Sequence, residues 1–100
     1  MITVIGLGPG HLDRVPRSVR SLLEDPSTTV VARTAQHPAA EELADLRPVV
    51  FCDDLYEAAD DFDEVYTAIV ERVIAVSGEG PVVYAVPGSP MVGEFAVREL

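Results

Sequence analysis

A glycine-rich segment near the amino terminus is the first place where this sequence could bind a ligand. Gly6, Gly8 and Gly10 occupy alternate positions, with Pro9 among them, directly after an apolar run over residues 2–5. Glycines in such a loop permit positive φ values and let a ligand approach the backbone closely. The segment is therefore a candidate ligand-facing loop, and a plain structural turn is the alternative.

The spacing of these glycines argues against a dinucleotide-binding fingerprint. That fingerprint reads G-x-G-x-x-G, whereas this loop reads G-x-G-x-G, and Pro9 removes one amide that would hold a pyrophosphate. A ribose-binding acid is expected about twenty residues beyond the glycines, but residues 32–40 contain none. A nucleotide-dependent oxidoreductase is therefore a weak alternative.

A second stiff loop follows the last apolar run, over residues 87–94. Pro87 and Pro90 enclose Gly88 and Ser89 and restrict the backbone of this turn. Ser89 could cap a following helix that has Pro90 in its first position, so capping alone would explain the pattern. Two such loops at strand ends together outline a concave pocket, suited to a neutral or zwitterionic small molecule.

Few other side chains have the spacing of a metal or acid–base site. His11 and His37 are the only histidines and lack metal-ligand spacing, so we expect His37 to make a local hydrogen bond. The acids in residues 53–57 lack the paired E-x-x-E helices of a pyrophosphohydrolase magnesium site, and no metal is predicted. Arg33, at a strand end, could meet a carboxylate of substrate or cofactor; an ion pair on the surface or with another part of the protein is the alternative.

Short apolar runs and helical periodicities alternate along the chain. Continuous runs rich in β-branched residues are typical of parallel strands buried on both faces, and they occupy residues 2–5, 28–32, 48–51 and 81–86. Helices are predicted over residues 17–24, 38–46 and 61–77, with a last one from Pro90 or Met91 still running at Leu100. This order predicts a doubly wound α/β fold, with a mainly parallel sheet and helices on both faces. Ligands bind such sheets beyond the strand carboxyl ends, where both loops lie.

The composition excludes several classes of protein. The 100 residues are 48% hydrophobic and carry a formal net charge of -10 at pH 7, which predicts one small folded domain. That charge repels phosphate backbones and anionic lipid heads, so neither nucleic acid nor membrane is an expected partner. The sequence has a single cysteine, Cys52, so an internal disulfide is excluded. We expect Cys52 to be a small core residue. The start lacks the pattern of a signal peptide, so a cytoplasmic location is expected.

The motifs and their order along the chain resemble the tetrapyrrole (corrin/porphyrin) methylase superfamily. Residues 2–10 (ITVIGLGPG) are similar to its opening, and residues 84–94 (YAVPGSPMVGE) resemble its fourth-strand loop. Further motifs resemble the YabN-like branch, in which the methylase domain precedes a MazG-type nucleoside triphosphate pyrophosphohydrolase. These motifs are Arg33-Thr34, His37-Pro38, residues 53–57, Phe62, Val65-Tyr66 and Ile69. The resemblance covers essentially all 100 residues.

The resemblance implies a two-lobed methylase with S-adenosylmethionine in the cleft between its lobes. Residues 1–100 would be the amino-terminal lobe, truncated before the second lobe, and a last helix without a stop signal agrees with this. Residues that match the cofactor-contacting segments of the family are Pro9, Gly88, Ser89, Pro90 and Val92. Residues that match the loop on the tetrapyrrole side of the cleft are Gly6, Gly8 and Gly10.

Two departures from the family pattern bear on activity. Ser89 replaces the aspartate that the methylases usually carry there, and His11 stands where many have an acid, although Asp13 is retained. No catalytic side chain is assigned, because methyl transfer depends chiefly on alignment.

The expected function is that of an S-adenosylmethionine-dependent methyltransferase-like lobe, which contributes half of a cofactor and small-molecule substrate cleft and is inactive as a fragment. The alternative is a non-catalytic binding or regulatory domain fused to the pyrophosphohydrolase. An apolar edge left open by the absent lobe also predicts self-association into a homo-oligomer.

Overall fold

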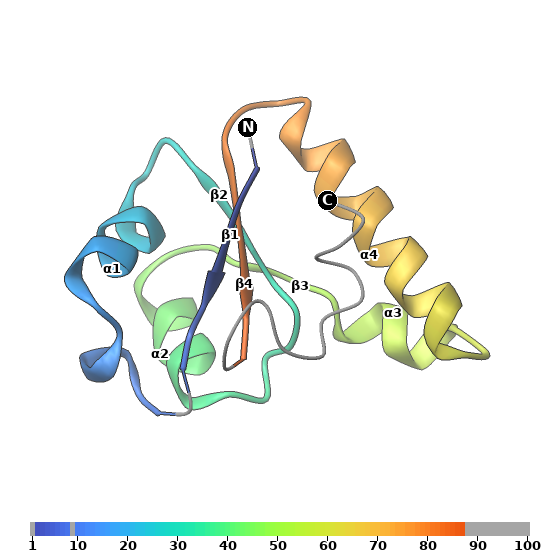
Figure 1. Cartoon of the computed structure of the whole chain (residues 1–100), viewed down its shortest axis with the longest axis horizontal. Helices are drawn as coiled ribbons and strands as arrows, with labels where there is room; N and C mark the ends of the chain where they lie inside the picture. The colour runs from blue at the N-terminus through green and yellow to red at the C-terminus, as the bar shows by residue number, and fades with distance from the viewer. Residues whose placement is uncertain (1, 9, 88–100) are drawn as a thin grey trace.

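A four-stranded parallel sheet lies between two layers of helices in the computed structural model, which describes residues 2–8 and 10–87 (Figure 1). The strands are β1 (Ile2–Gly6), β2 (Thr29–Ala32), β3 (Val50–Phe51) and β4 (Val82–Val86). They pair in the order β1-β4-β2-β3, and every pair is parallel. The predicted α/β fold with a parallel sheet and helices on both faces is thereby confirmed.

β4 is the most deeply buried strand. All five of its residues, Val82–Val86, are buried, because β1 and β2 flank its edges and helices cover both faces. β3 is a two-residue strand at the edge of the sheet, and its Val50 is exposed. A continuous apolar run therefore predicted burial on both faces correctly for the central strand β4, but less well for the edge strand β3.

The helices divide into two pairs, one on each face (Figure 1). α1 (Arg17–Glu24) and α2 (Pro38–Leu46) cover one face, where Leu23 and Leu43 pack in a core with Val30 and Val83. α3 (Asp53–Ala58) and α4 (Phe62–Ser77) cover the other face, and their core contains the residues Ile69, Val73, Val31 and Tyr84. Neighbouring strand residues thus point into opposite cores, as the pleat of a strand requires.

The change of face follows from the direction in which the chain crosses the sheet. The connections from β1 to β2 and from β2 to β3 both run toward the β3 edge, whereas the connection from β3 back to β4 reverses. Right-handed crossovers then require α1 and α2 on one face and α3 and α4 on the other.

The predicted boundaries of α1 and α2 are confirmed, and α4 begins one residue later than predicted. Asp61 is its N-cap, and the Asp61 side chain accepts a hydrogen bond from the backbone N–H of Glu64 at 2.8 Å. β1 extends one residue beyond its predicted end, through Gly6. The last predicted helix, from Pro90 or Met91, lies outside the described residues.

Two short elements were not predicted, α3 and a 3-10 turn over Leu12–Arg14. α3 has six residues, which is too short for an apolar periodicity to be recognised. Among the helices of residues 2–8 and 10–87, none is long and apolar enough to cross a membrane.

Candidate functional site

The loops that leave the carboxyl ends of the strands form the candidate site. We call residues 7–11, after β1, the glycine loop, and residues 33–37, after β2, the bridge loop. β3 leads through Cys52 directly into α3, and β4 ends beside Pro87. Because all four strands are parallel, these segments meet at one edge of the sheet, where ligands of open α/β folds bind.

An open pocket of about 440 Å³ lies at this edge. Its lining residues come from the bridge loop, the start of α3 and the end of β4, and they are Arg33, Thr34, Gln36, Asp53, Tyr56 and Pro87. The lining combines a cation, a carboxylate, a hydroxyl, an amide and apolar surface. Such a mixture suits a small polar molecule held by a few directed contacts.

Asp53 fixes the bridge loop against the first turn of α3. Its Oδ1 accepts a hydrogen bond from Thr34 Oγ1 at 2.7 Å, and its Oδ2 accepts one from the backbone N–H of Ala35 at 2.8 Å. Thr34 Oγ1 in turn accepts a hydrogen bond from the Gln36 N–H at 3.0 Å. Hydrogen bonds therefore join the bridge loop, which follows β2, to the start of α3, which follows the neighbouring strand β3, and they form the floor of the pocket.

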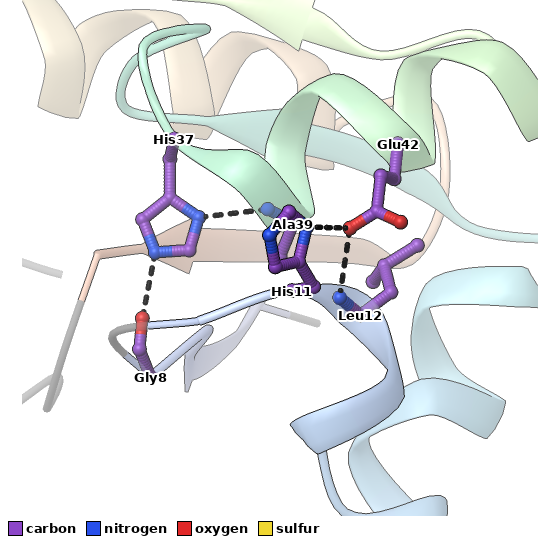
Figure 2. A network of polar contacts seen from close by, with 6 residues as sticks. All are labelled: Gly8, His11, Leu12, His37, Ala39 and Glu42. Atoms are coloured by element: carbon purple, nitrogen blue, oxygen red, sulfur yellow. Dashed lines mark hydrogen bonds and ion pairs between the residues drawn. The ribbon is translucent and has the colours of Figure 1, made fainter.

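His37 connects the bridge loop to the glycine loop (Figure 2). The ring is buried, with 8% of the residue exposed, and Nε2 lies 2.6 Å from the carbonyl oxygen of Gly8. Nδ1 accepts a hydrogen bond from the backbone N–H of Ala39 at 3.1 Å, which caps α2. The predicted local hydrogen bond of His37 is confirmed, and the longer-range one to Gly8 was not foreseen.

Glu42 holds the far end of the glycine loop, also from α2 (Figure 2). Its Oε1 accepts hydrogen bonds from Leu12 N–H at 3.1 Å and from His11 Nδ1 at 2.9 Å. These hydrogen bonds, the Leu12 one first, lower the pKa of Glu42. α2 and its N-cap residue therefore supply two side chains that tie down this loop.

Gly8 has a φ of 72°, in the left-handed region that favours glycine. Among residues 2–8 and 10–87, a Cβ placed there would meet no atom within 4 Å, so the described part of the chain leaves that side of the Gly8 backbone open. The neighbouring Leu7 N–H donates to the Val86 carbonyl oxygen at 2.8 Å, which keeps the loop beside the end of β4. The predicted role of glycine in a positive-φ turn is confirmed at Gly8.

The predicted site residues are only partly described. Gly8 and Gly10 lie on the glycine loop, while Gly6 is the last residue of β1 and pairs with Val86. The predicted cofactor-contacting residues Pro9, Gly88, Ser89, Pro90 and Val92 all lie outside the described residues. Among residues 2–8 and 10–87, no group of three or more histidine, cysteine, aspartate or glutamate side chains could hold a metal ion.

Four residues that line the pocket were not predicted as candidate ligand contacts: Thr34, Gln36, Asp53 and Tyr56. The acids in residues 53–57 were considered as a magnesium site, yet both carboxylate oxygens of Asp53 accept hydrogen bonds from the bridge loop. Its position two residues after the end of β3 was the available signal, because polar residues near a strand's carboxyl end lie at the ligand edge of a parallel sheet.

Comparisons with known proteins identify the family of this chain. The family model for tetrapyrrole (corrin/porphyrin) methylases matches residues 1–100. The chain is also 41% identical over 100 residues to "Uncharacterized protein YabN" of Bacillus subtilis (strain 168), a match that covers 99% of this chain and 20% of that protein. The chain thus spans about a fifth of the length of the curated relative it matches. By its sequence match over this whole length and by its parallel α/β fold, the chain belongs to the tetrapyrrole (corrin/porphyrin) methylase family.

Proposed function

We propose that this chain is the amino-terminal lobe of an S-adenosylmethionine-dependent methyltransferase, and that it supplies one wall of the cleft for cofactor and acceptor. The observation that carries the proposal is the placement of the glycine loop beside the end of β4, through the 2.8 Å hydrogen bond from Leu7 to Val86. The two family motifs, residues 2–10 and 84–94, run across these two strand ends. Family membership supports the cofactor class, since methylases of this kind generally use S-adenosylmethionine.

The described part of the cleft is compatible with such a cofactor. Among the described residues, none covers the Cα of Gly8 on its side-chain side, and a ligand that contacts main-chain atoms requires such open space. Pro9 and residues 88–92, which match the cofactor segments of the family, would complete this wall. The pocket of about 440 Å³ next to it, with Arg33 and Gln36 in its lining, would hold polar groups of the methyl acceptor.

When bound, S-adenosylmethionine would supply a methyl group on a positively charged sulfur, for displacement by the acceptor. The contribution expected of this chain is therefore to align and enclose the two reactants rather than to form a covalent intermediate. One lobe encloses them from one side only. We accordingly expect no methyl transfer by residues 1–100 alone.

Calorimetry on the full chain encoded by the gene tests the proposal. S-adenosylhomocysteine and S-adenosylmethionine should bind with micromolar dissociation constants, as expected of a cleft that encloses a cofactor, and NAD should not bind. If neither adenosyl compound binds, the methyltransferase proposal is contradicted. Binding of NAD would restore the oxidoreductase alternative that the glycine spacing disfavours.

A second candidate is a non-catalytic binding or regulatory domain, joined to a MazG-type pyrophosphohydrolase. The observation that favours it is Ser89 in place of the aspartate that the methylases usually carry. The length of the relative YabN, five times the matched segment, leaves room for other domains. Binding of S-adenosylhomocysteine without any methyl transfer, accompanied by a change in nucleoside triphosphate hydrolysis, would favour this candidate.

A further inference from the structure

The two ring nitrogens of His37 have different and mutually dependent roles. Nδ1 accepts the hydrogen bond from Ala39, and Nε2 faces the carbonyl oxygen of Gly8. A carbonyl oxygen can only accept, so Nε2 must carry the proton, and the accepting Nδ1 must be free of one. The cap of α2 and the anchor of the glycine loop therefore require one and the same neutral tautomer.

We propose that His37 is a positioning residue, which holds the glycine loop in the conformation that receives the cofactor; this inference rests on the proposed function. Among the described residues, the loop is tied near β4 by Leu7 and at its far end by Glu42. Between these points, the bond from His37 holds the carbonyl of Gly8, the residue with positive φ. This bond links the turn at Gly8 to the start of α2.

His37 is itself held on a rigid base. It ends the bridge loop, whose Thr34 and Ala35 are bonded to Asp53, and it begins α2. Its ring is buried, so the donor nitrogen has one position rather than many. The anchor thus connects the pocket floor to the cofactor loop. A side chain of the same length that was exposed to solvent would hold Gly8 less well, because fixing its rotamer would cost conformational entropy.

His37→Asn separates the two roles of the ring. Asparagine is a good N-cap, so its Oδ1 can still accept from the Ala39 amide. The asparagine side chain has no atom at the position of the histidine Nε2, so it cannot reach the carbonyl oxygen of Gly8. The matched control is Arg47→Gln, at the other end of the same helix, where Arg47 binds the carbonyl oxygens of Leu23, Asp25 and Thr28.

The measurement is calorimetry with S-adenosylhomocysteine on the full chain, well below the unfolding temperature of every variant. We expect His37→Asn to bind about 3- to 10-fold more weakly, as the loss of one hydrogen bond that orders a ligand loop predicts. Its stoichiometry should stay at that of the unmodified protein. Arg47→Gln should lower the unfolding temperature while its affinity is retained.

A purely structural role for His37 would give a different pattern, namely a lower binding stoichiometry at unchanged affinity, and this would overturn the inference. Equal affinity and stoichiometry in His37→Asn and the unmodified protein would overturn it too. Nitrogen NMR shifts provide an independent readout, because the inference requires the Nε2-protonated neutral ring in the unmodified protein.

The outcome can be distinguished from failure of the proposed function. If the unmodified protein does not bind S-adenosylhomocysteine, the methyltransferase proposal fails. Hydrogen exchange at the Gly8 and Gly10 amides then decides whether His37 anchors the loop. Faster exchange in His37→Asn than in Arg47→Gln would support the anchor, and equal rates would refute it.

Discussion

Arg72 donates two hydrogen bonds to the carboxylate of Asp54, at 2.7 and 2.8 Å, from α4 to the first turn of α3. The same guanidinium donates to the carbonyl oxygen of Phe51 at 2.9 Å. One arginine therefore secures both the end of β3 and the helix that presents Asp53 to the pocket. The hydrogen bonds from Arg72 lower the pKa of Asp54, and the pairing raises the pKa of Arg72.

Asp54→Asn should lower stability in a pH-dependent way. A carboxyl whose folded pKa is lowered stabilises the fold above its unfolded pKa, about 3.9 for aspartate, and loses this effect as pH falls through the folded pKa. The urea midpoint of the variant should therefore lie below that of the unmodified protein at pH 7 and approach it near pH 3. Asp45→Asn, on the outer side of α2, serves as a control that removes a charge without breaking this pair. A difference that is the same at both pH values would show that the pair does not act through its charge.

Arg47→Ala should lower the free energy of unfolding by about 2 kcal/mol. A hydrogen bond from a charged donor stabilises the fold more than one between neutral groups, and the substitution also leaves part-buried carbonyl oxygens without their donor. Its guanidinium donates to the carbonyl oxygens of Leu23, Asp25, Thr28 and Pro48, at distances of 2.7 to 3.1 Å. Arg47→Lys should recover less than half of the loss, since an ammonium group cannot reproduce this fork of donors. Chemical denaturation measures both values, and full recovery by lysine would contradict the geometric argument.

Gly8→Ala should cost about 1–2 kcal/mol of stability, because an alanine is forced into the left-handed region. The matched control is Gly10→Ala, on the same loop but without a positive φ. Its Cβ would lie 3.2 Å from Arg14 Cδ, in a flexible side chain that can move aside. Thermal unfolding of the two variants should therefore differ, and equal losses would exclude backbone conformation as the cause.

Cys52 should react slowly with thiol reagents in the folded protein. The residue is completely buried, and burial raises the pKa of its thiol to about 11. At pH 8 this leaves on the order of 0.1% thiolate, and only the thiolate is nucleophilic. Labelling with a disulfide reagent should be at least about 100-fold slower in buffer than in guanidinium chloride, where the cysteine is exposed and its pKa is ordinary. Comparable rates in both solvents would show that the edge near β3 opens readily.

Much of the fold was predictable from local patterns. The ends of α1 and α2 were predicted to the residue. The spacing of Val19, Leu22 and Leu23 indicated α1, and proline in the first turn marked the start of α2. The burial of Cys52 followed from its place at the end of an apolar run. By contrast, α3 has too few residues to display a period, and the use of Asp53 by the bridge loop depends on a strand neighbour.

The sequence by itself determined the fold class, the two loops built from glycine and proline, and the family. These properties are encoded in short segments, where each residue is close to its structural neighbours along the chain. The tertiary structure alone decided which loops meet. His37 and Gly8 are 29 residues apart and Thr34 and Asp53 are 19 apart, and each pair depends on the strand order β1-β4-β2-β3. Because that order arises from crossovers and packing on both faces, no local pattern could place the anchor of the glycine loop at His37.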